Sequence, residues 1–423
     1  MLEKLLSLGR KVIPKKLFRT GQPTYHYLLA LASALIYRFP SRKLNVVAVT
    51  GTKGKSTTTE LINAILEGAG FRTAVLNTIR FKVGKTDERN LYKMTIPGRF
   101  FTQRFLRRAV NAGCDWAVLE MTSEGAKQFR HKFIHFDALV FTNLSPEHIE
   151  SHGSYEKYRD AKLAIGRQLE KSRKPNCAVI ANIDDVEGSR FLGLRVSRSF
   201  PYSLENAKPY EKTEDGFRFL FRNTLMHTHL PGMFNLYNAL AAATFAASQN
   251  ITPADIATAF DAFTNIRGRV EYVTREPFAV VVDYAHTPDS LKQFYSVFTK
   301  DRNICVLGNT GGGRDRWKRP EMARIAEEHC THVILTNEDP YDENPEQIIQ
   351  EMSAGVADKK KLEAIMDRRQ AIRHALEIAH PGDNVLITGK GTDPYIMEAH
   401  GTKTPWDDAT VVREELKELG FRN

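Results

Sequence analysis

The stretch from Leu44 to Thr57 reads LNVVAVTGTKGKST and decides the fold class of this 423-residue chain. Its first seven residues form an apolar, β-branched run that stops at a glycine, which is typical of a buried parallel strand. Helical periodicity then continues to Gly68, with leucine and isoleucine side chains on one side. A glycine-rich turn between a strand and a helix is the context in which a phosphate-binding loop is expected.

This loop consists of Gly51, Thr52, Lys53, Gly54, Lys55, Ser56 and Thr57. Its glycines allow backbone N–H groups to close around phosphate oxygens, and the helix N-terminus adds a partial positive charge. Lys55 is placed to reach the terminal phosphates, and the Ser56 hydroxyl to ligate Mg²⁺. The spacing GxxGKS is shorter than the general GxxxxGK[ST]. The alternative, a turn that binds nothing, is disfavoured because GKST opens the helix directly after the strand.

Strand-like runs recur along the chain, with helix-like segments between most of them. The first series lies at 73–76, 116–120, 138–142 and 178–182, and a second lies at 278–282, 303–307, 332–335 and 384–387. Residues 206–232 alternate over short runs and predict an antiparallel patch, followed by helices at 235–248 and 253–263. The alternation predicts an α/β fold with parallel sheets. We expect a basic N-terminal segment over 1–45, an ATP-binding domain over 46–267 and a second α/β domain over 268–423.

Composition excludes several classes of protein. With 42% apolar and 26% charged residues, the chain is too apolar for a disordered protein. Its net charge of +10 is local, because residues 1–45 hold nine basic residues and one acidic residue, a net of +8, which leaves about +2 for the rest. Nucleic-acid binding is therefore not expected, since the body of the chain has no basic stripe with interleaved aromatic residues.

The cysteines and apolar runs bear on the compartment. Cys114, Cys177, Cys305 and Cys330 are far apart and form no CxxC pair, which predicts reduced thiols in a cytoplasmic protein. The start of the chain lacks the pattern of a secretory signal. The longest apolar stretch, residues 25–37, is shorter than the roughly 20 residues of a membrane-spanning helix.

Further motifs follow the loop in a fixed order. They are EMTSEGA (120–126), FTNLSPEHIESHGSYEKYRDAKL (141–163), LPGMFNLYNALAAA (230–243), GRVE (268–271), DYAHTPDSL (283–291), GGGRDRWKRPEMA (311–323) and GKGTDPY (389–395). Together with the loop, they resemble the Mur ligase family, MurE type, whose members join amino acids to a carboxylate in peptidoglycan precursors. The resemblance implies a central P-loop ATPase domain with a parallel sheet and a Rossmann-like C-terminal domain that binds the amino acid.

The resemblance also implies metal ligands. Glu120 and His148 follow predicted strands and would ligate Mg²⁺ together with Ser56, with two ions expected in all. Lys162 matches the family lysine that reacts with CO₂ to give a carbamate, whose oxygens reach the second ion. The alternatives are a surface loop histidine at His148 and a solvated helix lysine at Lys162.

Nucleotide contacts follow from the same resemblance. Asn235 and Asn238 would lie at the adenine side of ATP, Arg269 at a phosphate or the ribose, and Asp283 and His286 near the γ-phosphate with Lys55. The catalytic set is then Lys55, His148, Lys162, Arg269 and His286.

The expected substrate-binding residues are Arg314, Arg319, Glu338, Asp339, Tyr341, Gly389 and Asp393. Here the sequence departs from family members that select diaminopimelate. Where those members have the motif DNPR, this chain has Glu338-Asp339-Pro340-Tyr341 and lacks the arginine. Where they have GKGHE, this chain has GKGTD. Diaminopimelate is therefore not indicated by these segments, and Asp339 or Asp393 is a candidate contact for a cationic side chain such as that of lysine.

Residues 1–45 are too few to build the sugar-nucleotide-binding domain that normally precedes the ATP loop of the family. They predict two short helices, broken near Pro14 and between Gly21 and Pro23. Packing on the ATPase domain as a helical cap is favoured. The alternative is a basic amphipathic element on anionic lipid, which would place a cytoplasmic protein at the inner face of the membrane.

The expected function is an ATP-dependent ligase that adds an amino acid to a muramoyl-peptide-like carboxylate through an acyl phosphate. Its partners would be ATP, the amino acid and the muramoyl-peptide acceptor. The alternatives are a Mur-like ligase with another acceptor, of the lipid-linked, polyglutamate or cyanophycin type, or a non-catalytic ATP-binding regulator. The presence of Lys55, Ser56, Glu120, His148 and Lys162 disfavours the regulator.

Overall fold

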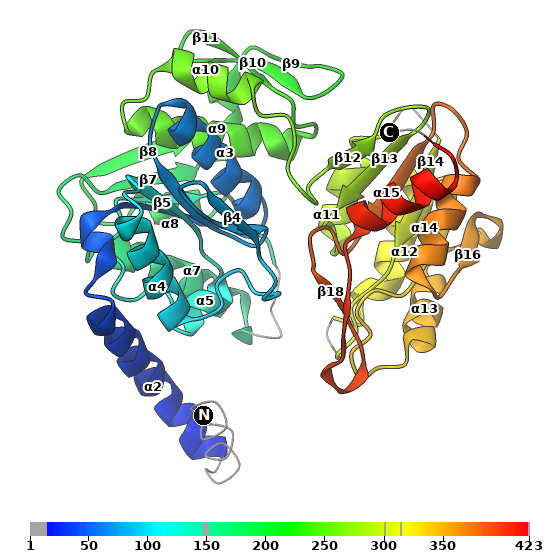
Figure 1. Ribbon diagram of the computed structural model, residues 1–423, viewed down its shortest axis with the longest axis horizontal. Coiled ribbons are helices and arrows are strands. Elements are labelled where there is room, and N and C mark those ends of the chain that lie inside the picture. Colours follow the sequence, from blue (N-terminus) through cyan, green and yellow to red (C-terminus); the bar gives the residue numbers. More distant parts are fainter. Residues whose placement is uncertain (1–14, 147–151, 300–301, 314, 422–423) are drawn as a thin grey trace. The chain divides into compact units, whose positions relative to one another are not determined.

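The computed structural model describes residues 15–146, 152–299, 302–313 and 315–421, and its ribbon is shown in Figure 1. Two compact units make up the described chain. Unit 1 contains the residues up to Arg89, Met94–Glu205 and Leu240–Ile256, and unit 2 contains Asn90–Lys93, Asn206–Ala239 and the residues from Ala257 onward. The domain limits expected near residues 45 and 267 remain predictions.

Unit 1 is built on a sheet that, within the described residues, has eight strands in the order β4–β3–β2–β5–β1–β6–β7–β8. The strands are β1 Asn45–Thr50, β2 Thr73–Leu76, β3 Arg80–Val83, β4 Thr86–Arg89, β5 Trp116–Glu120, β6 Ala138–Phe141, β7 Ala178–Asn182 and β8 Arg198–Tyr202. All pairs from β2 to β8 are parallel, whereas β3 and β4 add an antiparallel edge. The predicted parallel sheet is confirmed.

Helices of unit 1 pack around this sheet, except that the N-terminal helix extends away from it (Figure 1). They are α2 Lys15–Ile36, η1 Pro40–Lys43, α3 Lys55–Gly68, α4 Arg99–Asn111, α5 Ser123–Lys127, α7 Tyr155–Leu169 and α8 Gly188–Leu192. A core cluster joins alternate residues of the strands, such as Ala48 and Leu119, to Leu106 of α4, Ile165 of α7 and Phe191 of α8. This alternation is what a sheet covered by helices requires, because successive side chains of a strand point to opposite faces.

The predicted helix break between Gly21 and Pro23 is absent, whereas the predicted break near Pro14 lies outside the described residues. α2 is continuous from Lys15 to Ile36 and contains Pro23. A proline inside a helix removes one backbone hydrogen bond, and here that loss is tolerated by a segment whose later turns pack on unit 1. Ala30 and Ala34 are buried, and Tyr27 meets the rings of Phe129 and Phe133 edge to face. Within the described chain, no helix has the length and apolar character needed to cross a membrane.

Unit 2 contains a second α/β sheet. Its described strands run in the order β12–β13–β17–β14–β15–β16, parallel except for β12. They are β12 Glu271–Thr274, β13 Ala279–Asp283, β14 Asn303–Leu307, β15 His332–Leu335, β16 Leu362–Ala364 and β17 Asn384–Thr388, with β18 Tyr395–Met397 and β19 Lys403–Pro405 as a separate antiparallel pair.

Both faces of the second sheet are covered. The helices are α11 Pro288–Tyr295, α12 Lys318–His329, α13 Pro345–Ser353, η3 Lys359–Lys361, α14 Arg368–Glu377, η4 Ala399–Gly401 and α15 Asp408–Glu418. On β14, Leu307 belongs to the core with α11, α12 and α13, whereas Val306 belongs to the core with α14 and α15. The result is the three-layer arrangement of an α/β fold, as the sequence predicts.

The expected antiparallel patch is also present. β9 Tyr210–Lys212, β10 Phe217–Phe221 and β11 Thr224–Thr228 form a three-stranded sheet in the part of the chain that the structure describes. Helices α9 Met233–Ser248 and α10 Pro253–Asp261 follow.

The state of the cysteines differs from the prediction. Cys305 on β14 forms a disulfide with Cys330, which precedes β15, while Cys114 and Cys177 are free and buried. The expectation of reduced thiols is therefore wrong for Cys305 and Cys330. The two residues are 25 positions apart, and only the pairing of β14 with β15 brings their side chains together.

Candidate functional site

The phosphate loop lies between the end of β1 and the start of α3. Gly51 has a φ of +154°, and a Cβ atom there would lie 1.9 Å from the Thr142 hydroxyl and 3.0 Å from the Asn143 carbonyl. Gly54 is the N-cap of α3, with a φ of +78°. Neither position accommodates another residue without movement, because one is crowded and the other requires left-handed backbone.

The loop is fixed by the segment that follows β6. The N–H of Thr52 donates to the Asn143 carbonyl over 2.8 Å, and the N–H of Lys53 donates to the Asn143 side-chain oxygen over 2.9 Å. Lys55 Nζ donates to the Thr52 carbonyl over 2.7 Å. The predicted phosphate-binding lysine therefore lies over the loop itself.

Ser56 and Glu120, two of the predicted Mg²⁺ ligands, are in direct contact. The Ser56 hydroxyl donates to the Glu120 carboxylate over 2.9 Å, and both side chains are buried. Thr78 donates to the same carboxylate through its N–H over 2.9 Å and through its hydroxyl over 3.0 Å. A buried carboxylate beside a serine hydroxyl at the head of a phosphate loop is the oxygen donor set that Mg²⁺ prefers.

Lys162 lies on α7, and its Nζ donates to the Gly51 carbonyl over 2.5 Å. The residue is 2% exposed, and the ammonium lies 4.7 Å from the centre of the Tyr158 ring. The Tyr158 hydroxyl is 3.0 Å from that of Thr52. The alternative of a solvated helix lysine does not fit this burial.

Two predicted site residues, His148 and Arg314, lie outside the described residues. Sequence reasoning did not single out four residues of this region, namely Thr78, Asn143 and Tyr158, which contact the loop or its carboxylate, and His152, which contacts Tyr158. His152 Nε2 is 3.1 Å from the Ser123 hydroxyl, and its ring meets that of Tyr158 edge to face. Three of the four lie within the motif at residues 141–163, and that position is the sequence feature that could have identified them.

In unit 2, three of the predicted nucleotide residues lie at or near the carboxyl end of β13. Asp283 accepts hydrogen bonds from the N–H of Ala285 over 2.7 Å and from that of Val270 over 2.8 Å. The Arg269 guanidinium lies 4.5 Å from the centre of the Tyr284 ring, and the His286 ring lies 4.6 Å from the same ring. The structure therefore brings Arg269, Asp283 and His286 together.

Asn235 and Asn238 lie one turn apart on α9 and are both buried. The Asn238 amide donates to the Asn235 side-chain oxygen over 3.0 Å, and the Asn235 amide donates to the Pro231 carbonyl over 2.8 Å. The pair is thus fixed in orientation by hydrogen bonds.

The predicted substrate residues of unit 2 form an ion-pair cluster. Lys390 Nζ lies 2.8 Å from an Asp339 oxygen and 3.5 Å from Asp393, and Lys93 contacts Asp339 and lies 3.4 Å from Asp393. Burial raises the pKa of Asp339, but the charges of Lys390 and Lys93 outweigh it and lower the pKa below its usual range. Both candidate carboxylates for a cationic substrate are therefore already paired with lysines of this chain.

The pKa of Glu338 is shifted in the opposite direction to that of its neighbour Asp339. Burial, and then the negative charge of Asp339, raise the pKa of Glu338. One of its oxygens accepts from the Thr310 hydroxyl over 2.8 Å, and a Cβ atom at Gly389 would lie 2.3 Å from the other oxygen. Gly389 is therefore needed for the backbone to pass this carboxyl group.

The remaining substrate candidates have structural partners. Arg319 is fully buried and lies 2.9 Å from Glu343 and 2.7 Å from Glu351. Tyr341 has a φ of +52°, and its N–H donates to the Met397 carbonyl over 3.0 Å. The structure thus places Arg319 apart from the Asp339 cluster, within an ion-pair network of its own.

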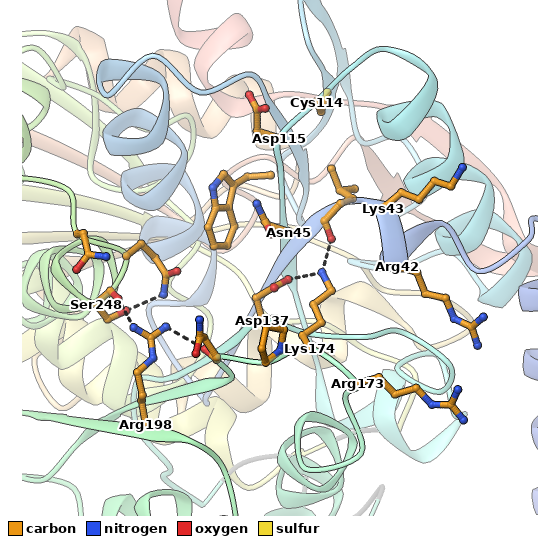
Figure 2. A pocket seen from close by; sticks show the side chains of 16 residues that line it. Arg42, Lys43, Asn45, Cys114, Asp115, Asp137, Arg173, Lys174, Arg198 and Ser248 are labelled. Atoms are coloured by element: carbon orange, nitrogen blue, oxygen red, sulfur yellow. Dashed lines mark hydrogen bonds and ion pairs between the residues drawn. The ribbon is translucent and has the colours of Figure 1, made fainter.

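A cavity of about 770 Å³ lies elsewhere in unit 1 (Figure 2). It is lined by Asn45 and Trp116, which begin β1 and β5, whereas the phosphate loop follows the end of β1. Lys174 is paired there with Asp137 over 2.5 Å, and the Arg198 guanidinium donates to the Ser248 carbonyl. No predicted site residue lines this cavity.

Two family profiles match the sequence. Residues 49–246 match the "Mur ligase middle domain" and residues 268–391 match the "Mur ligase, glutamate ligase domain". A UDP-N-acetylmuramoyl-L-alanyl-D-glutamate--2,6-diaminopimelate ligase from Syntrophomonas wolfei is 38% identical over 410 residues, which cover 93% of this chain and 83% of that protein. A UDP-N-acetylmuramyl-tripeptide synthetase from Roseiflexus sp. is 35% identical over 94% of this chain and 84% of its own length.

Solved structures show the same architecture. A UDP-N-acetylmuramoyl-L-alanyl-D-glutamate--2,6-diaminopimelate ligase superposes with a TM-score of 0.62 at 28% identity and covers 90% of this chain and 79% of its own. A folylpolyglutamate synthase from Mycobacterium tuberculosis, complexed with ADP and AMPPCP, has a TM-score of 0.68 at 15% identity, with 88% of this chain and 96% of its own covered. The second likeness shows the fold alone.

Proposed function

The chain belongs to the Mur ligase family, and we propose that it is an ATP-dependent amide ligase of the MurE type that adds an amino acid to the carboxylate of a muramoyl peptide in peptidoglycan precursor synthesis. One observation supports this most directly. A phosphate loop with Lys55 at its head meets the buried Ser56–Glu120 pair on one side and the buried Lys162 on the other.

The reaction joins anions, so its main requirement is fixed positive charge. A substrate carboxylate attacks the γ-phosphorus of ATP, and the bond to ADP breaks to give an acyl phosphate. The amine of the amino acid then attacks the acyl carbon, loses a proton and expels phosphate. Lys55 and the N–H groups of the loop stabilise charge on the phosphate oxygens. Mg²⁺, held by Ser56, Glu120 and His148, would neutralise the negative charge of the phosphates.

We also propose that Lys162 is N-carboxylated in the working enzyme. Its unprotonated Nζ attacks the carbon of CO₂, an N–C bond forms, and the nitrogen loses a proton to leave a carbamate. This converts a buried cation into an oxygen donor for a second Mg²⁺. The support is the 2% exposure of Lys162 and its 2.5 Å contact with the loop at Gly51. Magnetic resonance with isotopically labelled bicarbonate would detect the carbamate carbon in the wild type and not in Lys162→Arg.

The amino acid is best decided by a panel. Relatives are named for 2,6-diaminopimelate, whereas Tyr341 stands where the family arginine is expected and Lys93 and Lys390 neutralise Asp339 and Asp393. The ammonium group of a lysine substrate would have to displace Lys93 or Lys390 from its carboxylate partner. We therefore expect diaminopimelate to be preferred over lysine.

Phosphate release from ATP tests the proposed ligase. We expect release that depends on both a muramoyl-peptide acceptor and an amino acid, and a product whose mass includes both. Lys55→Ala should abolish it, whereas Lys85→Ala, an exposed lysine beside β4, should not. No release with any acceptor and amino acid would favour the ATP-binding regulator.

We further propose that α2 contacts anionic lipid. The helix begins with Lys15 and Lys16, and Leu28, Leu35 and Ile36 are 57%, 57% and 64% exposed on it. Cationic and exposed apolar residues on one helix suit an interfacial element. Full-length protein should sediment with anionic but not neutral vesicles, and Leu35→Gln/Ile36→Gln should reduce this. Equal sedimentation of wild type and variant would show that α2 is only a cap on unit 1.

A further inference from the structure

Two histidines and a glutamate converge in unit 2, at the edge of the second sheet where β15 begins. His332 Nε2 lies 3.0 Å from one oxygen of Glu363, and His374 Nε2 lies 2.8 Å from the other. One nitrogen from each ring and a carboxylate oxygen all lie within 4.8 Å of one another. None of the three belongs to the nucleotide or substrate residues described above.

The fold explains why these side chains meet. On β15, His332 and Ile334 point to the same face, and Glu363 on β16 is paired with Ile334. This is the face covered by α14, because Ile334 packs in one core with Ala371 and Ala375. His374 precedes Ala375 on α14, at the border of its buried stripe. β15, β16 and α14 therefore each place one of the three side chains at the same position.

The hydrogen bonding of the two rings indicates more than an ion pair. Both Nε2 atoms are shielded from solvent, and neither has a hydrogen-bond partner among the described residues, although each is close to a Glu363 oxygen. The carboxylate oxygens are thus near the nitrogens but not along their N–H direction. Leaving such nitrogens unpaired is energetically unfavourable.

A cation held between the rings and the carboxylate would satisfy all three groups. Two ligand atoms about 2.0–2.1 Å from a tetrahedral zinc ion lie roughly 3.3 Å apart. The two nitrogens lie 3.0 Å and 2.8 Å from different oxygens of Glu363, so a small movement of these side chains would admit the ion. Two imidazole nitrogens and a carboxylate suit Zn²⁺ and related transition metals rather than Mg²⁺. We propose that His332, Glu363 and His374 form a transition-metal site, with water completing the coordination, that ties the edge strand β16 to β15 and α14.

A second cluster, of two histidines and an aspartate, has a different pattern of hydrogen bonds. His227 and His229 lie beside Asp215, but both rings have hydrogen bonds to that carboxylate. One nitrogen of each ring is therefore satisfied within the protein. The site at His332 differs because its nitrogens are not, and it is independent of the proposed ligase activity.

Equilibrium dialysis with Zn²⁺, in excess Mg²⁺, tests the proposal on the full chain. We expect His332→Asn, His374→Asn and Glu363→Gln each to bind one zinc ion fewer than the wild type. The affinity loss should exceed the roughly 10–100-fold that changes outside the ligand shell cause. His400→Asn is the matched control, since His400 is exposed and its left-handed backbone, with φ of +57°, suits asparagine.

Two further measurements guard against variants that fold poorly. Zn²⁺ should raise the thermal midpoint of the wild type and of His400→Asn. The same addition should raise the midpoint of Glu363→Gln by less. Co²⁺ bound to the wild type should show the visible absorption of a nitrogen- and oxygen-ligated ion, and Zn²⁺ should displace it. Equal zinc binding by the wild type and all three site variants would overturn the proposal.

Discussion

Lys162 Nζ donates a hydrogen bond to the carbonyl oxygen of Gly51 over 2.5 Å, across 111 residues of sequence. The contact joins α7 to the first residue of the phosphate loop, which directly follows β1. Because Lys162 is 2% exposed, this hydrogen bond is shielded from water and fixes the loop more strongly than a surface contact would. The loop conformation therefore depends on a residue far along the chain.

Replacing Lys162 should damage catalysis without unfolding the protein. We expect Lys162→Ala to lower kcat by about 10²–10³-fold, an effect as large as the loss of one oxyanion-hole donor, because the variant loses both the contact with the loop and the proposed oxygen donor for the second Mg²⁺. Lys157→Ala, on the exposed side of α7, is the control and should retain full activity. Steady-state phosphate release measures both. A Lys162→Ala enzyme as active as Lys157→Ala would contradict the role of this lysine in the reaction.

Gly51 should be intolerant of a side chain. In Gly51→Ala, the new Cβ would meet the Thr142 hydroxyl at 1.9 Å and the Asn143 carbonyl at 3.0 Å, so the loop must move. We expect a loss of about 1–3 kcal/mol in the free energy of unfolding, as for overpacking in general, and a loss of ATP binding.

Gly70→Ala separates crowding from backbone strain at Gly51. Gly70 also has a positive φ, of +87°, but a Cβ there would meet no atom within 4 Å. We expect it to lose stability through strain alone and to keep its affinity for ATP. Chemical denaturation and nucleotide titration measure the two effects. Similar ATP affinity for both variants would show that crowding at Gly51 does not shape the site.

Local patterns were sufficient for the parallel sheets and the loop. The buried strands β1, β5, β6 and β7 are continuous apolar runs, and such runs between helical segments are typical of parallel strands buried on both faces. The exposed edge strand β4, TDER, carries no such pattern. It forms because β3 offers an unpaired edge, which is a property of the assembled sheet and not of the four residues.

Contacts made by distant residues could not be predicted. The Asp339 and Asp393 carboxylates looked available to a cationic substrate, but Lys93 reaches them from a segment more than 200 residues earlier, as its 246-residue separation from Asp339 shows. The Cys305–Cys330 disulfide and the unbroken α2 were missed for the same reason. In each case, tertiary packing outweighs the local signal.

His131 should make the protein less stable in acid. Its side chain is fully buried, and neither ring nitrogen has a hydrogen-bond partner among the described residues. Burial, and then the charge of Lys132, lower the pKa of His131 to about 3. In the unfolded chain the pKa is about 6.5. Between these values only the unfolded chain binds the proton, so stability is full above about pH 6.5 and falls by up to about 1.4 kcal/mol per pH unit below it.

Replacing His131 by leucine should reduce this pH dependence. The variant His131→Leu removes the titrating group and needs no hydrogen-bond partner, so its free energy of unfolding should fall less between about pH 7 and pH 5 than that of the wild type. Chemical denaturation at both pH values gives the difference, with His400→Asn as an exposed control. If His131→Leu and the wild type lose the same stability, His131 is protonated in the folded state.

The ion pair between Arg368 and Asp408 should be costly to break on one side. The Arg368 guanidinium donates to both Asp408 oxygens over 2.8 Å, and the side chains are 1% and 0% exposed. It joins the start of α14 to the start of α15. Asp408→Ala leaves a buried guanidinium without its counter-charge, for which we expect a loss of about 3–5 kcal/mol.

Two comparisons test this interpretation of Arg368 and Asp408. The double variant Arg368→Met/Asp408→Leu removes both charges and should be clearly more stable than Asp408→Ala, because apolar side chains of similar volume can replace a buried pair. Arg324→Ala breaks the exposed pair with Glu328 on α12, whose side chains are 50% and 51% exposed, and should cost less than about 1 kcal/mol. Chemical denaturation gives all three values. An Asp408→Ala loss as small as that of Arg324→Ala would mean that water reaches Arg368, and that α14 and α15 are held together by their apolar core instead.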